Sequence, residues 1–143
     1  MILIDIGNTN IVFAVSSNKV LKNIIRIESN QNIKKLNISI KKIIKNLIKI
    51  QKLDIPNIAV ISSVVPVLNK PIIKILKINK ISELLLQPKS ILPFLKIDYN
   101  INEIGSDRIA NSIAVINKNI KNSIVIDFGT ATTFEVIKEG IFS

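Results

Sequence analysis

The hydrophobic positions along this chain fall into two patterns: short apolar runs separated by turn residues, and apolar residues spaced three or four apart. The first pattern is typical of strands and the second of helices. Taken in order, they predict a mixed sheet with helices packed on it, βββαβαβ over residues 1 to about 100. The predicted strands are residues 2–4, 11–15, 19–28, 58–61 and 84–86, and the predicted helices are residues 32–53 and 67–78.

Turn-forming and proline residues set the boundaries of these elements. Residues 16–18 predict the turn between the second and third strands, and residues 54–57 end the first helix. Pro71 should interrupt the second helix, which is therefore predicted to be short or kinked. The segment from residue 92 to residue 99 then leads to the next motif.

The first predicted helix is basic and amphipathic. Its lysines fall mostly away from an apolar stripe, which favours a helix packed on a sheet and leaves a helix lying on a membrane surface as the alternative. The stripe is formed by Ile33, Leu36, Ile40, Ile43, Ile44 and Leu47.

Residues 124–136 form a candidate site for a cation and a phosphate. An apolar run, predicted to be a buried strand, ends in Asp127 and Gly129, and a threonine-rich strand follows. A carboxylate at a strand end can hold a cation beside a phosphate, while glycine lets the backbone approach and Thr130 donates to phosphate oxygens. The alternative is an ordinary hairpin with a glycine turn.

The same arrangement opens the chain, where an apolar run leads to Asp5, Gly7, Asn8 and Thr9 and then to a second strand. Gly7 and Asn8 suit the positive-φ positions of a tight turn. Two such hairpins suggest two related halves that offer phosphate-binding loops to a shared cleft. This pattern predicts an actin-like nucleotide-binding fold.

A third motif, Gly-Ser-Asp-Arg at residues 105–108, opens a helix with apolar positions up to Ile120. Ser106 is the expected N-cap, and Asp107 should lie in the first turn near the positive end of the helix dipole. Helix capping alone would explain Asp107. The functional interpretation makes Asp107 a general base, with Arg108 beside it to hold an anionic substrate.

The composition of the chain excludes some kinds of metal site and catalytic base and makes nucleic-acid binding a weaker interpretation. The chain has 143 residues, is 48% hydrophobic and carries a net charge of +10, but its lysines are dispersed and aromatic residues make up only 4%. These features favour a lysine-coated surface over nucleic-acid binding. Without cysteine or histidine there is no thiolate metal site and no histidine base. Asp5 within the first apolar run argues against a signal peptide, so the predicted location is cytoplasmic, with no membrane association.

The three motifs resemble those of type III pantothenate kinase, a family of the actin-like (ribonuclease H-like) kinase superfamily. The matching segments are DIGNT at residues 5–9, GSDR at 105–108 and DFGTATT at 127–133, joined by SSVVP at 62–66. The resemblance implies ATP-dependent phosphorylation of pantothenate, the first step of coenzyme A biosynthesis, with Mg²⁺ and a monovalent cation, K⁺ or NH₄⁺. It also implies a homodimer in the full-length family.

The resemblance assigns roles to individual residues. Asp107 would be the catalytic base, Asp127 would hold the monovalent cation, and Asp5 would act on Mg²⁺ indirectly. Pantothenate would contact Tyr99, Gly105, Ser106, Asp107 and Arg108. ATP phosphates would contact Asp5, Ile6, Gly7, Asn8, Thr9, Asn10, Ile11, Val12 and Thr130. The family places a proline between the tyrosine and the GSDR motif, and this chain lacks it.

The family is also longer than this chain by roughly a hundred residues. The sequence therefore predicts a first domain over residues 1–103 and an incomplete second domain over residues 104–143, whose last hairpin would expose an apolar face and an open edge. Two alternatives remain at this point. One is an inactive or regulatory remnant, similar to a transcription accessory factor that binds nucleic acid, and the other is a different actin-like phosphotransferase or phosphatase.

Overall fold

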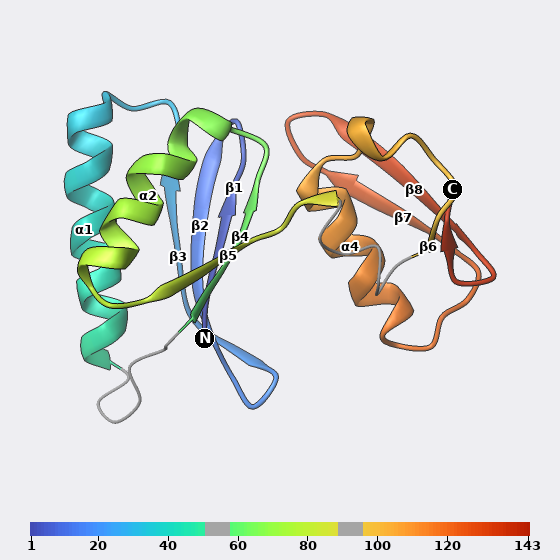
Figure 1. Ribbon diagram of the computed structural model, residues 1–143, viewed down its shortest axis with the longest axis horizontal. Coiled ribbons are helices and arrows are strands. Elements are labelled where there is room, and N and C mark those ends of the chain that lie inside the picture. Colours follow the sequence, from blue (N-terminus) through green and yellow to red (C-terminus); the bar gives the residue numbers. More distant parts are fainter. Residues whose placement is uncertain (51–57, 89–95) are drawn as a thin grey trace. The chain divides into compact units, whose positions relative to one another are not determined.

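The computed structural model describes residues 1–50, 58–88 and 96–143, and the chain forms two compact units, Met1–Leu85 and Leu86–Ser143 (Figure 1). The predicted helix break at residues 54–57 and the start of the segment predicted at residues 92–99 lie outside the described residues. The domain boundary expected after residue 103 stays a prediction.

The first unit is a five-stranded sheet with two helices, in the strand order β3-β2-β1-β4-β5. The β1–β2 and β2–β3 pairs are antiparallel, while β1–β4 and β4–β5 are parallel. The predicted order βββαβαβ and the mixed sheet are confirmed. The elements are β1 (Ile2–Ile6), β2 (Asn10–Ser17), β3 (Val20–Glu28), α1 (Ile33–Ile50), β4 (Ile58–Ser63), α2 (Pro66–Ile78) and β5 (Ser82–Leu85).

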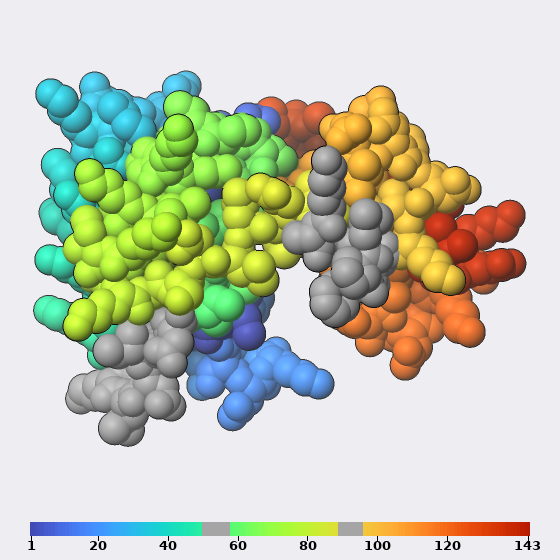
Figure 2. Space-filling model, viewed as in Figure 1, coloured from blue at the N-terminus to red at the C-terminus, as the bar shows by residue number. Residues whose placement is uncertain are grey.

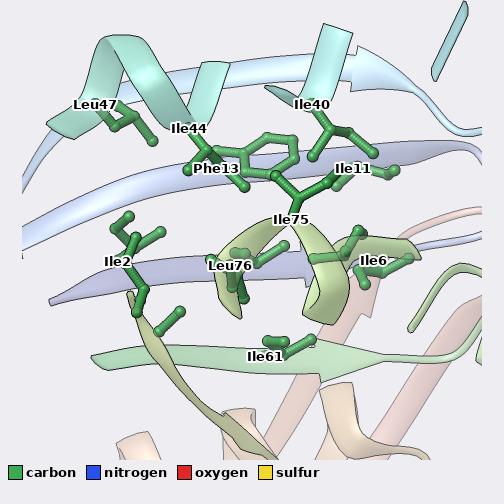
Figure 3. Packing of buried hydrophobic residues seen from close by; sticks show 14 of the residues in the cluster. Ile2, Ile6, Ile11, Phe13, Ile40, Ile44, Leu47, Ile61, Ile75 and Leu76 are labelled. Atoms are coloured by element: carbon green, nitrogen blue, oxygen red, sulfur yellow. The ribbon is translucent and has the colours of Figure 1, made fainter. Parts of the chain in front are cut away.

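The core of this unit lies between one face of the sheet and both helices (Figure 3). Alternate residues of a strand point to the same face, so every second residue of β1 and β2 is buried there. The buried strand residues are Ile2, Ile4, Ile6, Ile11, Phe13 and Val15. The same alternation turns Asp5 to the opposite face, where it is exposed.

Helix α1 packs on the sheet through most of its predicted stripe, but Ile33, its first residue, is 45% exposed. Leu36, Ile40, Ile44 and Leu47 are at most 1% exposed, and its lysines point away from the core. Its apolar face is therefore used inside the protein. None of the helices in residues 1–50, 58–88 and 96–143 is long and apolar enough to cross a membrane.

Helix α2 continues through Pro71 rather than being interrupted there. Proline inside a helix costs about 3 kcal/mol because a hydrogen bond is lost and the ring meets the preceding turn. Burial of Leu68, Ile72, Ile75 and Leu76 against the sheet offsets that cost. Pro66 lies in the first turn, where its missing N–H has no helical partner to lose.

The turn between β2 and β3 differs from the sequence prediction. Ser16 and Ser17 belong to β2, and the turn is Asn18–Lys19, with φ angles of 50° and 63°. Two positive φ angles between directly paired strands are typical of a type I′ turn. The turn projects from the first unit, in blue at the lower edge of Figures 1 and 2.

Lys19→Gly is expected to stabilise the first unit by about 1 kcal/mol, because a residue with a Cβ is strained in the left-handed region and glycine is not. Lys22→Gly is the matched control. It lies within β3 without a positive φ, so it should destabilise the unit by roughly 0.5–1 kcal/mol. Urea unfolding followed by far-ultraviolet circular dichroism measures both. Equal effects of the two substitutions would contradict the turn assignment.

The second unit is a four-stranded sheet, in the order β6-β9-β8-β7, with α4 on one face. The β7–β8 and β8–β9 pairs are antiparallel, and β6 runs parallel to β9. Ile104, Ile109 and Phe142 form its small core. The elements are β6 (Lys96–Ile97), the 3₁₀ helix η1 (Ile101–Glu103), α4 (Ser106–Ile116), β7 (Ser123–Phe128), β8 (Thr132–Lys138) and β9 (Ile141–Phe142).

The other face of the β7–β8 hairpin is apolar and exposed, as the sequence predicts. The predicted burial of the strand at residues 124–126 is wrong, because Ile124 is 66% exposed and no described element covers this face. Within the described residues β7 pairs only with β8, so its outer edge is open. The exposed apolar side chains are Ile124, Ile126, Phe128, Phe134 and Val136.

Candidate active site

Two hairpins place their carboxylates in equivalent positions. Asp5 is the next-to-last residue of β1 and pairs with Val12 of β2. Asp127 is the next-to-last residue of β7 and pairs with Thr133 of β8. Each strand is followed by a short loop that begins with glycine. The two hairpins belong to different units. Both are antiparallel, both carry the aspartate next to the end of the first strand, and both begin their loop with glycine.

Hydrogen bonds from several directions hold the first loop. The N–H of Gly7 donates to the carbonyl of Asn10 at 2.9 Å. Ser29 donates its hydroxyl to the carbonyl of Gly7 at 2.6 Å and its N–H to the carbonyl of Thr9 at 2.8 Å. The N–H of Val64, the residue directly after β4, donates to the carbonyl of Ile6 at 3.0 Å. The backbone of residues 5–12 is therefore preformed.

The reason for glycine in this loop differs from the sequence prediction. Neither Gly7 nor Asn8 has a positive φ, so the expected left-handed turn is wrong. A Cβ added to Gly7 would instead lie 3.2 Å from the carbonyl oxygen of Asn10, closer than ordinary contact. Ile6 and Ile11 are fully buried beneath the loop, so their side chains support it from the core.

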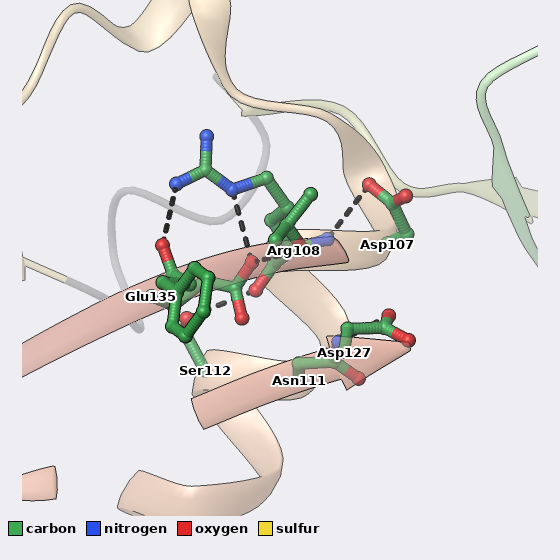
Figure 4. A network of polar contacts seen from close by, with 8 residues as sticks. Asp107, Arg108, Asn111, Ser112, Asp127 and Glu135 are labelled. Carbon is green, nitrogen blue, oxygen red and sulfur yellow. Dashed lines mark hydrogen bonds and ion pairs between the residues drawn. The ribbon is translucent and has the colours of Figure 1, made fainter. Parts of the chain in front are cut away.

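The second loop lies next to α4. Thr130 is exposed there, and the N–H of Gly129 donates to the carbonyl of Ala131 at 3.2 Å. Asn111 of α4 donates its side-chain amide to Oδ2 of the half-buried Asp127 at 3.0 Å (Figure 4). Sequence reasoning missed Asn111. The available signal was its position four residues after Asp107, on the same face of the helix.

Helix α4 begins one residue earlier than its predicted cap implies. Gly105 is the N-cap, with an extended backbone, and Ser106 is the first helical residue, so the assignment of Ser106 as N-cap is wrong. Ser106 is buried. Asp107 lies in the first turn, as predicted, and its Oδ1 accepts a hydrogen bond from the N–H of Arg108 at 2.8 Å. The carboxylate thus sits at the positive end of the helix dipole.

Arg108 is held against β8 and β9. Its Nε donates to Oε1 of Glu135 at 3.0 Å, and its Nη2 donates to the carbonyl of Phe134 at 3.3 Å (Figure 4). Its guanidinium lies 5.5 Å from the ring centre of Phe142, and the ring of Tyr99 meets Phe142 edge-on at 6.3 Å. The second unit therefore brings Tyr99 and the GSDR motif together around one phenylalanine.

Glu135 is the second functional candidate that the sequence reasoning missed. It is fully buried, and its Oε1 also accepts a hydrogen bond from the hydroxyl of Thr133 at 3.0 Å. The alternation along β8 already indicated that Glu135 lies on the inward face, because it shares that face with Thr133 and Ile137. A carboxylate at an inward position next to Ile137 needs a positively charged partner.

The described residues offer single carboxylates, rather than a preformed cluster, to the cations that the family resemblance implies. Within the described ranges no three acidic side chains cluster into a metal site, so a divalent ion would need oxygens from a bound phosphate. Asp127 offers an oxygen ligand that Asn111 orients, which suits a hard cation. Asp5 offers an exposed carboxylate at the end of β1.

Comparisons with known proteins connect this arrangement to one family. A family model described as type III pantothenate kinase matches residues 1–142. The type III pantothenate kinases of Moorella thermoacetica and Ehrlichia canis are 36% and 38% identical to this chain, and each alignment covers 97% of it. The chain spans 55% and 54% of those relatives, about half of their length.

A solved structure supports the fold independently. The ethanolamine utilization protein EutJ from Carboxydothermus hydrogenoformans superposes with a TM-score of 0.55 at 15% identity, covering 99% of this chain and 48% of EutJ. At that identity the likeness concerns the fold alone. It confirms the predicted α/β actin-like fold.

Proposed function

Because the chain belongs to the type III pantothenate kinase family, we propose that it phosphorylates pantothenate with ATP, the first step of coenzyme A biosynthesis. One observation carries the proposal. The first turn of α4 presents Asp107 and Arg108 together, on the same helix whose Asn111 holds Asp127. Helix α4 thus carries a base and a cation for an anionic substrate, and through Asn111 it also orients the β7 carboxylate that could hold a metal ion.

The proposed reaction is an in-line displacement. The hydroxyl oxygen of pantothenate attacks the γ-phosphorus, the bond between that phosphorus and the bridging oxygen breaks, and ADP leaves. The hydroxyl proton passes to Asp107, whose Oδ1 is held by the N–H of Arg108, so Oδ2 is the oxygen that accepts it. Arg108 binds the carboxylate of pantothenate, with Tyr99, Gly105 and Ser106 completing the substrate contacts. Positioning the hydroxyl oxygen against the γ-phosphorus supplies most of the rate enhancement.

ATP binding is assigned to the two hairpins. The preformed backbone of residues 5–12 and the hydroxyl of Thr130 are proposed to contact its phosphates. Mg²⁺ bound with ATP would offset phosphate charge, and Asp5 would act on it indirectly. Asp127 would hold K⁺ or NH₄⁺. A homodimer, a cytoplasmic location and a second domain starting after residue 103 are further proposals that follow from the family resemblance.

Two substrates test the proposal directly. The chain is incubated with ATP, Mg²⁺ and K⁺ and either pantothenate or pantothenyl alcohol, which keeps the reacting hydroxyl but lacks the carboxylate. Phosphorylation of pantothenate is expected, with kcat/KM for the alcohol lower by about tenfold or more, because a charge-assisted bond is worth roughly 1.5–3 kcal/mol. Equal use of both substrates would contradict the role of Arg108. Transfer to neither would favour the non-catalytic alternative.

A further inference from the structure

We propose that Glu135 is a positioning residue, which holds Arg108 by its Nε edge so that Nη1 faces the carboxylate of pantothenate. This inference rests on the proposed function. Glu135 does not touch substrate in this scheme, since its side chain is fully buried. It acts through Arg108, one of only two arginines in the chain.

A buried carboxylate requires an explanation in so small a unit. Removing a charged group from water is costly unless it is paired and hydrogen-bonded, and an apolar residue of similar volume would often stabilise the fold as well or better. Glu135 points into the same face as Ile137, which is 1% exposed, where leucine would pack without that cost. A role beyond packing is therefore the better account of the carboxylate.

The hydrogen bonds of Glu135 are concentrated on one oxygen. Oε1 accepts from Nε of Arg108 and from the hydroxyl of Thr133, each at 3.0 Å. Oε2 is buried and has no hydrogen-bond partner among the residues that the structure describes. Arg108 is therefore the group that balances the charge of Glu135, and any rotation of the guanidinium away from Oε1 would leave that charge uncompensated.

The consequence is a fixed guanidinium. Nε and Nη2 are used by Glu135 and by the carbonyl of Phe134, and the flat group lies over Phe142. Nη1 remains outside these contacts, and it points away from the network in Figure 4. The side chain of Arg108 is 24% exposed, so part of the group reaches solvent while the rest is locked. Such preorganisation removes the cost of ordering a long side chain when the substrate binds.

Three substitutions separate a positioning role of Glu135 from a packing role. If Glu135 acts by positioning Arg108, an uncharged side chain that still accepts a hydrogen bond from Nε will preserve substrate binding, and a side chain without an acceptor will weaken it. If it acts only by packing, neither change will affect substrate binding in the folded protein. Glu135→Gln keeps the acceptor, Glu135→Leu removes it, and Glu135→Asp keeps the charge but shortens the reach to Nε.

Nitrogen-15 spectra of the full chain provide the measurement, because only Arg26 and Arg108 contribute arginine Nε signals. Arg26→Lys assigns the remaining signal to Arg108. Pantothenate alone is titrated, and the dissociation constant is taken from the shift of that signal. We expect Glu135→Gln to stay within about threefold of the unaltered chain, and Glu135→Leu and Glu135→Asp to bind about tenfold more weakly or worse, with faster exchange of the Nε proton.

The outcomes separate the two claims. If the unaltered chain binds pantothenate and Glu135→Leu binds it equally well, the positioning role is wrong and the proposed function stands. If the unaltered chain shows no pantothenate-dependent change, the proposed function falls and this inference falls with it. Glu135→Asp decides the matter where Glu135→Leu fails to fold, and Thr133→Val is the control, because it removes the other donor to Oε1 and should leave the affinity unchanged.

Discussion

Asp107→Asn is expected to lower the rate of pantothenate phosphorylation roughly 10²–10⁴-fold, the usual contribution of a positioned general base. Asparagine keeps the volume of the side chain and an oxygen that can accept from the N–H of Arg108, but it no longer takes up the hydroxyl proton. The effect should fall on kcat more than on KM, because the side chain acts on the reacting hydroxyl. Release of ADP that depends on pantothenate is the measurement.

Two controls separate this result from a loss of structure. Asp107 lies in the first turn of α4, so neutralising it should cost only about 0.3–1 kcal/mol of dipole stabilisation and leave the unit folded. Asp98→Asn makes the same chemical change at an exposed position of the same unit and should leave the rate unchanged. A rate for Asp107→Asn within about threefold of the unaltered chain would remove Asp107 from the mechanism.

The parts of the fold that were predictable from sequence are those fixed by short stretches of chain. The order of elements along the chain, βββαβαβ, follows from local periodicity, and the stripe of Leu36, Ile40, Ile44 and Leu47 already identifies the buried face of α1. The two hairpins follow from an apolar run that ends in aspartate and glycine. The position of Asp107 in a first turn follows from the start of an apolar stripe.

The parts that were not predictable depend on residues far apart in the chain. Ile124 forms a strand because of its local sequence, but its exposure depends on whether another element covers that face. Glu135 and Arg108 are separated by 27 positions, and Asn111 and Asp127 by 16, so no local pattern links either pair. The backbone at Gly7 depends on the approach of Asn10 across the loop rather than on the turn rules for glycine.

Arg108→Met is expected to destabilise the second unit by about 3–5 kcal/mol, although Arg108 is proposed to bind substrate. Methionine replaces the apolar stem, but it leaves Glu135 fully buried with its charge uncompensated. Small domains have a total stability of about 5–15 kcal/mol, so this unit should be largely unfolded at low denaturant concentration. The single tyrosine, Tyr99, packs on Phe142 and reports the transition by fluorescence, since the chain has no tryptophan.

The double substitution Arg108→Met with Glu135→Leu should recover most of that loss, because replacing a buried ion pair by apolar side chains is often neutral or stabilising. Glu135→Leu alone should cost less than Arg108→Met, because the guanidinium is 24% exposed and can turn to water, whereas the carboxylate is 0% exposed. Far-ultraviolet circular dichroism, to which α1 and α2 contribute most, should show the first unit unchanged. Additive losses in the double variant would mean that the two side chains stabilise the unit independently, and that their contact is not what holds Arg108 in place.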